Sequence, residues 1–523
     1  MKICILAAGK GARMGTYSKK INKSLLPIEN KAAISHIIEL FHETDEFVIG
    51  LGYLGYQVKD YLRAAHPNIK FQFVNIKNFD GKGSGPGFSL LKCKKFLNES
   101  FFFLPCDGIF PNKINFRYNK NWIGIAKVSS DESNKYCNIA VKNNRVADIR
   151  DKTIVNDDYF VFTGLLYVKD YHEFWKSLEK STLIKNEHQI SDGLHGLMKN
   201  SGLFVKEVKW FDFGDIEKYH KIQKKFHSSS ISKTNEFIYF TDNNVIKFFA
   251  DTKIIDNRII KTKHNPSVFP KVKRLGKNFY QYPYWNGDTF YSNGTPILFK
   301  KLLNWLENNV WIKYKIPNSR MKELCETFYH TKTNSRISLF LSDNPDYIFP
   351  KFINGKITPS LEKLFQQIPW KELFCGIPSF IHGDLQFQNI LYNKKSKKFL
   401  LVDWRQDFAG STKFGDLYYD LAKLYGGILM NYDHVIKDNF QYQHTGNKVI
   451  VSFKKWKNAS EYKKILDDYI NKNNFDKYKV QLLTGLIYLN MAALHHKPFN
   501  FALISYGLCI IRDALNEKKL SFK

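Results

Sequence analysis

Two stretches of the chain carry polar side chains at spacings that suit the chemistry of nucleotide phosphates. In the later stretch, Asp384 follows a His-Gly pair, Asn389 stands five positions on, and Asp403 ends an apolar run. Phosphoryl transfer needs one carboxylate to orient the attacking hydroxyl, and an amide and a second carboxylate to hold Mg²⁺ against the nucleotide phosphates. The spacing supplies these groups in the required order and therefore predicts a phosphotransferase centre.

The earlier stretch is a glycine-rich loop with two cations. It follows the apolar segment 3–6 and contains Arg13, and Lys23 stands ten residues further on. Glycines let backbone amides approach phosphates, and a guanidinium binds phosphate oxygens bidentately. Met14 takes the third glycine position of a dinucleotide site, and no Gly-Lys-Ser/Thr closes a Walker loop. The loop therefore predicts a nucleotide site of another kind.

The elements that must position these residues show strand and helix patterns. Strands are predicted at residues 3–6, 47–51, 101–104, 237–240 and 245–249, and helices at residues 33–41, 298–311, 482–494 and 501–515. The early alternation of strands and helices predicts an α/β domain. The later strand pair followed by helices predicts an α+β domain.

Length and composition predict more than one domain. The chain has 523 residues, of which 44% are hydrophobic, and this is enough for two or three domains that each bury a core. The small polar cluster Ser228–Thr234 marks the predicted boundary, so the domains are expected to cover residues 1–226 and 228–523. Two interpretations of the cluster stay open: a simple connection, or a loop whose hydroxyls and amides cover a phosphate.

The charge and cysteine patterns narrow the class of protein. The net charge of +30 is spread along the chain without a nucleic-acid motif, so the expected partners are small-molecule substrates rather than nucleic acid. Seven scattered cysteines without a C-x-x-C pair argue against a disulfide framework or a zinc site and indicate a cytoplasmic location. The uncharged run 480–494 falls short of a transmembrane segment, so a buried helix is expected. The sequence carries no signal for an oligomeric state.

The early stretch resembles the sugar-phosphate and phosphocholine nucleotidyltransferases. Leu6–Met14 matches their L-A-A-G-x-G-x-R-[ML] motif, and Lys23 with Leu26-Pro27-Ile28 matches the P-K-x-L-[LV]-P-[IV] motif that follows. Asn22 replaces the usual proline, and the segment 81–86 lacks the common Gly-Thr-Ala form of the loop near the base. The resemblance covers nearly all of residues 1–226 and implies a Rossmann-like domain with a mixed sheet.

This resemblance implies a role for each matching residue in nucleotidyl transfer to a phosphate. Arg13 and Lys23 would neutralise the departing pyrophosphate, and Lys152 the incoming phosphate. Asp107 and Asp212 would hold Mg²⁺. The residues that would contact the nucleotide are Ala8, Gly9, Gly11 and Gly83. Glu187 and Asp192, on a helical stretch after Lys185, are instead predicted to be surface or capping residues.

The later stretch resembles the choline kinase and aminoglycoside phosphotransferase superfamily. Besides the His-Gly-Asp motif, Asp403-Trp404 and the segment 415–422 match this family. The resemblance implies a protein-kinase-like α+β domain, with a small lobe at about residues 228–287 and a large lobe at about residues 288–523.

The same resemblance implies the roles of single residues in phosphoryl transfer from ATP. Asp384 would be the catalytic base, and Asn389 and Asp403 would hold Mg²⁺. Lys247, in the second strand of the predicted pair, would bind the α- and β-phosphates of ATP. Asp420 is expected to hold the catalytic loop in place rather than to act in catalysis.

A kinase joined to a nucleotidyltransferase suggests consecutive steps. The second domain would phosphorylate a small alcohol or choline-like amino alcohol, and the first would couple that phosphate to a nucleotide. CTP is favoured, because the usual sugar-nucleotide form of the base loop is missing, and the product would be a precursor for surface polysaccharide or lipid. Two alternatives stay open: a sugar kinase with a sugar-1-phosphate nucleotidyltransferase, and a nucleotidyltransferase with a non-catalytic kinase-like binding module.

Overall fold

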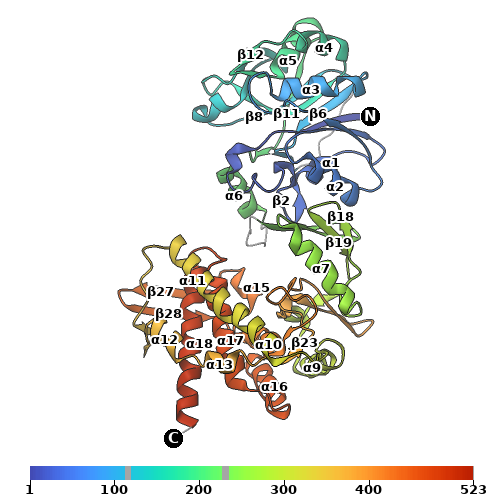
Figure 1. Cartoon of the computed structure of the whole chain (residues 1–523). Coiled ribbons are helices and arrows are strands. Elements are labelled where there is room, and N and C mark those ends of the chain that lie inside the picture. Colours follow the sequence, from blue (N-terminus) through green and yellow to red (C-terminus); the bar gives the residue numbers. More distant parts are fainter. Residues whose placement is uncertain (112–118, 227–234, 522–523) are drawn as a thin grey trace. The chain divides into compact units, whose positions relative to one another are not determined.

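The computed structural model describes residues 1–111, 119–226 and 235–521 of the chain (Figure 1). The contacts within it divide the chain into two compact units. Unit 1 comprises Met1–Asp251 and Lys273–Gln281, and unit 2 comprises Thr252–Val272 and Tyr282–Lys523. The polar cluster Ser228–Thr234, at the predicted domain boundary, lies outside the described residues.

Unit 1 is built on a mixed nine-stranded sheet with the strand order β5-β4-β1-β6-β11-β8-β14-β10-β9. The first four strands are parallel, and β11 runs antiparallel to β6 and β8. The Rossmann-like arrangement with a mixed sheet is therefore confirmed. The strands are β1 (Lys2–Ala7), β4 (Glu46–Leu51), β5 (Lys70–Asn75), β6 (Phe101–Pro105), β8 (Trp122–Ala126), β9 (Cys137–Lys142), β10 (Arg145–Asp151), β11 (Phe160–Val168) and β14 (Phe204–Glu207).

The strand order places two loops side by side at the carboxyl edge of the sheet. β1 lies between β4 and β6, and Leu6 of β1 is in register with Pro105 of β6. Ligands of open parallel sheets bind outside the carboxyl ends of neighbouring strands. The loop after β1, which contains Gly9 and Arg13, and the turn after β6, which contains Asp107, therefore lie at the same edge.

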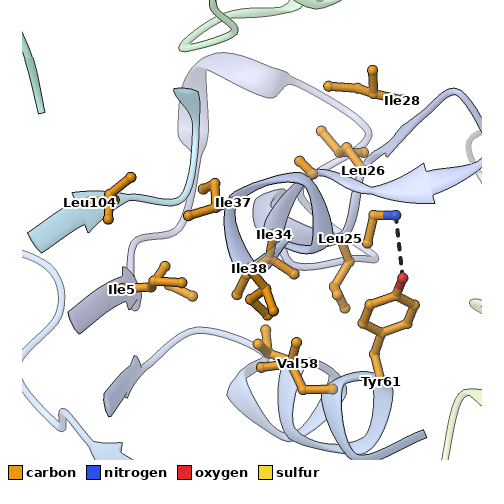
Figure 2. Close-up of a cluster of buried hydrophobic side chains, with 14 of the residues drawn as sticks. Ile5, Leu25, Leu26, Ile28, Ile34, Ile37, Ile38, Val58, Tyr61 and Leu104 are labelled. Atoms are coloured by element: carbon orange, nitrogen blue, oxygen red, sulfur yellow. Dashed lines mark hydrogen bonds between the residues drawn. The ribbon is translucent and has the colours of Figure 1, made fainter. Parts of the chain in front are cut away.

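Helices pack on this sheet through apolar side chains that are buried on both partners. Figure 2 shows Ile5 of β1 and Leu104 of β6 on the same side as Ile34, Ile37 and Ile38 of the first helix. Burial of each such side chain contributes about 1.5–3 kcal/mol, so this cluster fixes the two strands that carry the loops. The helices are α1 (Ala33–Ile38), α2 (Gly55–Ala65), α3 (Pro86–Cys93), α4 (Tyr171–Leu178), α5 (Ser191–Asn200) and α6 (Ile216–Lys225).

A four-stranded sheet with the order β16-β17-β19-β18 shares the core of unit 1. Tyr239 of β16 donates a hydrogen bond to the carbonyl of Leu25 at 2.7 Å and packs edge-on against Tyr61 of α2. The predicted strand pair is confirmed as β16 and β17, whereas the two-domain division with its small lobe stays a prediction. The strands are β16 (Glu236–Phe240), β17 (Asn244–Phe249), β18 (Lys273–Leu275) and β19 (Phe279–Pro283).

Unit 2 is mainly helical. Figure 1 shows α17 and α18 packed along each other in red. α17 is buried over most of its length, which confirms the buried helix predicted at residues 480–494. Within the described residues, no helix combines the length and the apolarity needed to cross a membrane. The longer helices include α7 (Thr252–His264), α9 (Pro296–Asn309), α10 (Asn318–Cys325), α11 (Lys332–Asp343), α14 (Leu417–Leu429), α16 (Ala459–Lys472), α17 (Lys477–Ala492) and α18 (Phe499–Ser521).

Short elements of unit 2 carry the His-Gly-Asp segment. β24 (Ile390–Asn393) and β25 (Lys398–Leu401) pair antiparallel directly after it, and Asp403 follows the end of β25. A π-helix, Glu326–Thr331, joins α10 to α11, and such segments are frequent at functional sites. Other short elements are β20 (Asp288–Thr289), β21 (Phe352–Ile353), β22 (Lys356–Ile357), β23 (Pro378–Ser379), β26 (Gly415–Asp416), β27 (Phe440–Thr445), β28 (Lys448–Phe453), α8 (Phe290–Asn293), α12 (Leu361–Gln367), α13 (Trp370–Leu373) and α15 (Tyr432–Val435).

Because the four-stranded sheet shares the core of unit 1, truncating one of its buried side chains is expected to destabilise the whole unit. Phe248 of β17 is fully buried, whereas Phe240 of β16 is 37% exposed. Phe248→Ala should lower the free energy of unfolding of unit 1 by about 3–5 kcal/mol, and the matched control Phe240→Ala by about 0.5 kcal/mol. Hydrogen exchange of the β1 amides measures both effects. Equal protection of β1 in the two variants would contradict a shared core.

Candidate functional site

Asp107 and Asp212, the predicted Mg²⁺ ligands of unit 1, are brought together by a two-stranded sheet. β7 (Gly108–Ile109) pairs with β15 (Phe211–Asp212), with Asp212 opposite Gly108. The amide of Phe213 also donates a hydrogen bond to the carbonyl of Asp107 at 3.1 Å. The two carboxylates thus stand at neighbouring strand ends, although they are far apart in the sequence.

Lys23 forms an ion pair with Asp107, and 2.7 Å separate Nζ from Oδ2. Lys23 opens a 3-10 helix that extends to Leu25, and its side chain is only 9% exposed. Burial acts to raise the pKa of Asp107, but the charge and hydrogen bond of Lys23 and the charge of Arg13 hold this pKa below its ordinary value. Asp107 is therefore ionised at neutral pH, and the contact is a true charge pair.

Asn22, at the position where the family usually has proline, anchors the turn before the ion-paired lysine. Its Nδ2 donates to the carbonyls of Ala7 at 3.0 Å and Tyr53 at 2.7 Å. Its Oδ1 accepts from the amide of Ser24 at 3.0 Å, and its own amide donates to Gln57 Oε1 at 2.9 Å. Asn22 is buried, so these bonds tie the end of β1 and the start of α2 to this turn.

The carboxylate of Asp212 is held by groups that no sequence motif revealed. Tyr136 donates its hydroxyl hydrogen to Oδ2 at 2.7 Å, and the amide of Gly214 donates to Oδ1 at 2.7 Å. Lys218 Nζ lies 3.2 Å from Asp212 Oδ2 and 3.2 Å from Glu132 Oε1. Burial acts to lower the pKa of Lys218, but Asp212 and Glu132 raise it above its ordinary value. The one sequence signal for Lys218 is its place in the first turn of the helix that follows Asp212.

The glycine-rich loop brings Arg13 to the same place. A methyl group added at Gly214 would lie 3.3 Å from Arg13 Nη2 and 3.0 Å from Asp212 Oδ1, so the guanidinium and this carboxylate flank one glycine. Gly11 has a φ of +63°, which favours glycine, and a methyl group there would lie 3.2 Å from Lys23 Cβ. The fold therefore gathers the predicted cations and carboxylates at one edge, while their roles stay predictions.

Ala8 and Gly9 form the first part of the loop. The carbonyl of Ala8 accepts a hydrogen bond from the amide of Tyr53 at 2.9 Å. Gly52 packs so closely that a methyl group there would lie 2.4 Å from the same carbonyl, whereas a methyl group at Gly9 would meet no atom within 4 Å. The loop is thus fixed at Ala8 and open at Gly9, which suits a backbone that receives a phosphate.

Lys152 and Gly83 meet at the hairpin of β12 and β13, which covers residues 183–188. Lys152 Nζ lies 3.1 Å from Glu187 Oε2, and the amide of Gly83 donates into the hairpin turn at 2.9 Å. The Lys152 amide also donates to the carbonyl of Tyr136 at 2.8 Å, which links it to the tyrosine that contacts the second carboxylate. The predicted helical stretch is wrong at Glu187, which lies in β13, whereas it is confirmed at Asp192, which lies in α5.

The donor set at the carboxylate pair fits Mg²⁺. Within residues 1–111, 119–226 and 235–521, no group of three or more His, Cys, Asp and Glu side chains is arranged to hold a metal ion. Mg²⁺ does not need such a group, because one or two carboxylates together with substrate phosphates usually bind it. Asp107 and Asp212 are therefore the residues that would hold it.

In unit 2, Asp420 fixes the loop that carries Asp384, as predicted. Its carboxylate accepts hydrogen bonds from the amides of His382 at 2.8 Å and Gly383 at 2.7 Å, and burial raises the pKa of Asp420 to about 6. Burial also lowers the pKa of His382 to about 4, so the ring is neutral at pH 7. Its Nδ1 accepts from the amide of Asp384 at 3.2 Å, which assigns the Nε2 hydrogen to the carbonyl of Val402 at 2.9 Å.

Asn389 and Asp403 are adjacent because the backbone pairs between them. The amide of Val402 donates to the carbonyl of Asn389 at 2.9 Å, and Asn389 Nδ2 donates to the carbonyl of Asp384 at 2.9 Å. Asp403 has a φ of 56°, which is uncommon for a residue other than glycine, and its Oδ1 lies 3.3 Å from Arg258 Nη1 of α7. An amide oxygen beside a carboxylate suits Mg²⁺, so these two residues would hold it here.

Cations that no motif revealed surround Asp384. Lys423 of α14 pairs with it, and 2.8 Å separate Nζ from Oδ1. Burial acts to lower the pKa of Lys423, but Asp384 raises it above its ordinary value, so Lys423 is charged. The pKa of Lys332, the first residue of α11, is lowered well below its ordinary value by burial and by the charges of Arg405 and Lys423. Basic side chains therefore surround Asp384, and the charge of Lys423 pairs with it.

Lys247, the predicted ATP-binding lysine, is buried in β17 of unit 1, whereas Asp384 belongs to unit 2. Its role therefore stays a prediction. Within unit 2, Lys261 of α7 contacts the loop that carries Asp384, because its Nζ donates to the carbonyls of His382 at 3.2 Å and Arg405 at 2.8 Å. Burial lowers the pKa of Lys261 to about 7.

Restoring the family's proline at position 22 is expected to destabilise unit 1. The backbone suits proline, because φ is −62°. Asn22→Pro nevertheless removes the donor to Gln57 and the buried side-chain bonds, and buried groups left without partners cost about 1–3 kcal/mol each. Hydrogen exchange of the β1 amides measures the loss. Asn22→Ala keeps the backbone donor, so the stability of its unit 1 should lie between that of the wild type and that of Asn22→Pro. A proline variant as stable as the wild type would contradict the anchoring role.

A known protein family matches the N-terminal part of the chain. Residues 3–118 match the family described as "MobA-like NTP transferase domain". The "Bifunctional protein GlmU" of Methanococcus vannielii is 26% identical over 228 residues, which are 41% of this chain and 52% of the relative. The "UTP--glucose-1-phosphate uridylyltransferase" of Synechocystis sp. is 32% identical over 120 residues, which are 21% of this chain and 31% of the relative.

A crystal structure of UDP-glucose pyrophosphorylase complexed with UDP-glucose covers 44% of this chain and 99% of its own, at 21% identity and a TM-score of 0.38. The chain spans about half the length of its curated relative GlmU. The resemblance of the later stretch to choline kinases stays a prediction. The matched residues 3–118, which include Arg13, Lys23 and Asp107, are similar to a MobA-like NTP transferase domain.

Proposed function

We propose that the chain is a bifunctional enzyme that phosphorylates a sugar-like alcohol and then activates the phosphate. Unit 1 joins the phosphate of the small molecule to the α-phosphorus of a nucleoside triphosphate and releases pyrophosphate. The kinase-like half transfers a phosphoryl group from ATP to a hydroxyl of the small molecule. The product is a nucleotide-linked precursor of the kind that surface polysaccharide or lipid synthesis consumes.

The observation that carries the first activity is the gathering of opposite charges at the sheet edge. Lys23 pairs with Asp107, and Arg13 and Lys218 lie beside Asp212. Two negatively charged reactants must meet in nucleotidyl transfer, so the site needs fixed cations more than it needs a strong base. Mg²⁺ bound at the carboxylates would neutralise phosphate charge. The lysines would then be available to bind phosphate oxygens.

The reaction needs the acceptor phosphate in line with the departing pyrophosphate. A bond forms between an acceptor oxygen and the α-phosphorus while the bond from that phosphorus to pyrophosphate breaks. The open backbone at Gly9 and the guanidinium of Arg13 support the leaving group, and Lys152 supports the acceptor phosphate. Positioning of this kind supplies much of the rate enhancement in such transfers.

Several observations support a sugar phosphate and a pyrimidine nucleotide as the substrates of unit 1. One relative is named for UTP and glucose 1-phosphate. The segment 81–86 departs from the Gly-Thr-Ala form that is usual for sugar nucleotides, which favours CTP. The lysine and arginine side chains gathered beside Asp384 disfavour a cationic acceptor such as choline. We therefore assign CTP or UTP as the nucleotide and a sugar-like phosphate as the acceptor.

The geometry around Asp384 supports the second activity. Lys423 holds one carboxylate oxygen at 2.8 Å, and Asp420 fixes the backbone on the N-terminal side of Asp384. A carboxylate oriented in this way can receive the proton of an attacking hydroxyl. Asn389 and Asp403 stand next to it as the residues that would hold Mg²⁺.

A nucleotidyltransferase with a non-catalytic kinase-like module is the second candidate. The contact that favours it is the ion pair of Arg258 with Asp403, at 3.3 Å, because this pair places a cation on a predicted metal ligand. Phosphorylation assays separate the two candidates, since only the first requires Asp384.

Asp212→Asn removes one carboxylate charge of unit 1 and keeps the size of the side chain. We expect the rate of pyrophosphate release to fall about 10²–10³-fold, because a charged group at the reacting phosphates is lost. Asp215→Asn is the matched control: Asp215 caps α6 through the amide of Lys218 at 2.9 Å, and asparagine caps equally well. An unchanged rate in the Asp212 variant would remove this residue from the site.

A mass-detected screen tests the whole proposal. The full chain is incubated with ATP, one nucleoside triphosphate and a panel of sugars, polyols and amino alcohols. We expect a nucleotide-linked product with CTP or UTP, and the same product without ATP when the phosphorylated compound is supplied. Asp384→Asn should abolish only the ATP-dependent route. If this variant phosphorylates as well as the wild type, the kinase assignment is wrong.

A further inference from the structure

Cations stand around Asp384 on α11 and α14 of unit 2 and in the segment that follows β25. Lys423 of α14 contacts Asp384 at 2.8 Å. Lys332 of α11 lies over the ring of Phe328, with Nζ 3.8 Å from the ring centre. The guanidinium carbon of Arg405 lies 4.9 Å from the centre of the same ring. Two cations thus share one aromatic ring close to the predicted catalytic base.

Lys423 pairs with Asp384, but the other cations lack acidic partners within the residues that the structure describes. In the described part of the chain, no carboxylate forms an ion pair with Lys332, Arg336 or Arg405. Arg336 follows Lys332 by one turn of α11 and adds its charge to the group. Arg405 Nε is buried and has no hydrogen-bond partner. Like charges a few ångströms apart repel each other, so the arrangement favours an anion in their midst.

An aromatic framework holds the cations in place. Phe328 stacks on Phe408 with 4.1 Å between ring centres and meets Tyr419 edge-on at 4.9 Å. Tyr419 lies one turn before Lys423 on α14, and Lys332 Nζ lies 5.9 Å from its ring centre. The π-helix that joins α10 to α11 ends directly before Lys332. Lys423 is buried, whereas Lys332, Arg336 and Arg405 are half-buried beside this framework, so the cluster can be reached from solvent.

We propose that this cluster binds an acid group of the acceptor, so that the kinase-like half phosphorylates a sugar or polyol that already carries a carboxylate or a phosphate. The inference rests on the proposed phosphotransferase function. The acceptor hydroxyl oxygen bonds to the γ-phosphorus of ATP, the bond from that phosphorus to ADP breaks, and the hydroxyl proton passes to Asp384. The acid group stays unchanged and orients the acceptor. A choline-like cation would be repelled.

The position of the cluster assigns it to the acceptor rather than to ATP. The predicted metal ligands Asn389 and Asp403 mark the place of the ATP phosphates, and the cation beside Asp403 comes from α7. Lys332 and Lys423 come instead from α11 and α14. Loss of a cluster charge should therefore change the KM for the acceptor and not the KM for ATP.

Steady-state kinetics of the full chain test the inference. Each sugar or polyol of the panel is offered as the neutral compound, its carboxylate and its phosphate, with choline beside them. We expect kcat/KM for an anionic form to exceed that of its neutral parent about 10- to 100-fold, as charged hydrogen bonds allow. The carboxylate and phosphate arms identify the acid group. Equal or better use of neutral compounds or choline would overturn the anionic acceptor.

Substitutions of Lys332 then test whether this side chain binds the acid group of the acceptor. Lys332→Met should raise the KM for the anionic acceptor about tenfold or more, and Lys332→Arg should restore most of the affinity, because it keeps the charge. Lys322→Met, which removes an exposed lysine of α10, is the matched control and should change neither KM. An unchanged acceptor KM in Lys332→Met, or a change confined to ATP, would overturn the proposal.

Different results would contradict the kinase function and the anion site. If the wild-type chain phosphorylates no compound of the panel, the kinase function is wrong. Calorimetric titration with the sugar phosphates and sugar acids then decides about the site. Binding that Lys332→Met abolishes and Lys322→Met retains supports an anion site in a non-catalytic module. Absence of binding to the wild type overturns it.

Discussion

Lys23 Nζ and Asp107 Oδ2 lie 2.7 Å apart at the point where the loops after β1 and β6 meet. Lys23 is almost fully buried, and a buried charge that loses its partner is strongly destabilising. The strand register and the hydrogen bonds that set the distance between Lys23 and Asp107 are therefore under constraint. This distance depends on the register of β1 with β6 and on the hydrogen bonds of Asn22 in the turn before Lys23. It also depends on the hydrogen bond from the amide of Phe213 to the carbonyl of Asp107.

The same constraint explains why the four-stranded sheet packs into unit 1. Tyr239 of β16 donates to the carbonyl of Leu25, two residues after the ion-paired lysine, and its ring packs on Tyr61 of α2. Gln57 of α2 reaches the turn from the other direction through the amide of Asn22. The turn is thus held by the main sheet, by α2 and by the second sheet together. The strand that carries the predicted ATP-binding lysine belongs to this packing.

The parts of each site that lie in one local sequence pattern could be predicted from the sequence. The glycine-rich loop, the strand-end Asp107 and the His-Gly-Asp segment could be recognised because their spacing is itself the signal. Tyr136 and Lys218 could not, since only the fold brings them to Asp212. The same holds for the cations around Asp384, which come from helices without a motif.

The error at Glu187 has a local cause. Lys185 and Asn186 have φ values of 49° and 66°, and two such residues form the tight turn that a β-hairpin requires. Asn is among the residues that adopt this conformation readily, so the pair was a turn signal within an apparently helical stretch. The hairpin places Glu187 opposite Ile184 and beside Lys152. The bonds of Asn22 were equally hidden, because a sequence shows that an amide replaces proline but not which carbonyls it meets.

The two sites differ in how their charges balance, and this difference bears on their substrates. In unit 1, Asp107 forms an ion pair with Lys23, and Lys218 forms ion pairs with both Asp212 and Glu132. Each of these carboxylates therefore has a cationic partner. In unit 2, Asp384 pairs with Lys423, and within the described residues no carboxylate forms an ion pair with Lys332, Arg336 or Arg405. In a site whose charges balance, a metal and phosphates bind when the carboxylates and the cations exchange each other for these new partners. A site with surplus positive charge is completed by a substrate that brings negative charge of its own. The proposed acid group would be distinct from the new phosphate, which is the group that unit 1 would join to the nucleotide.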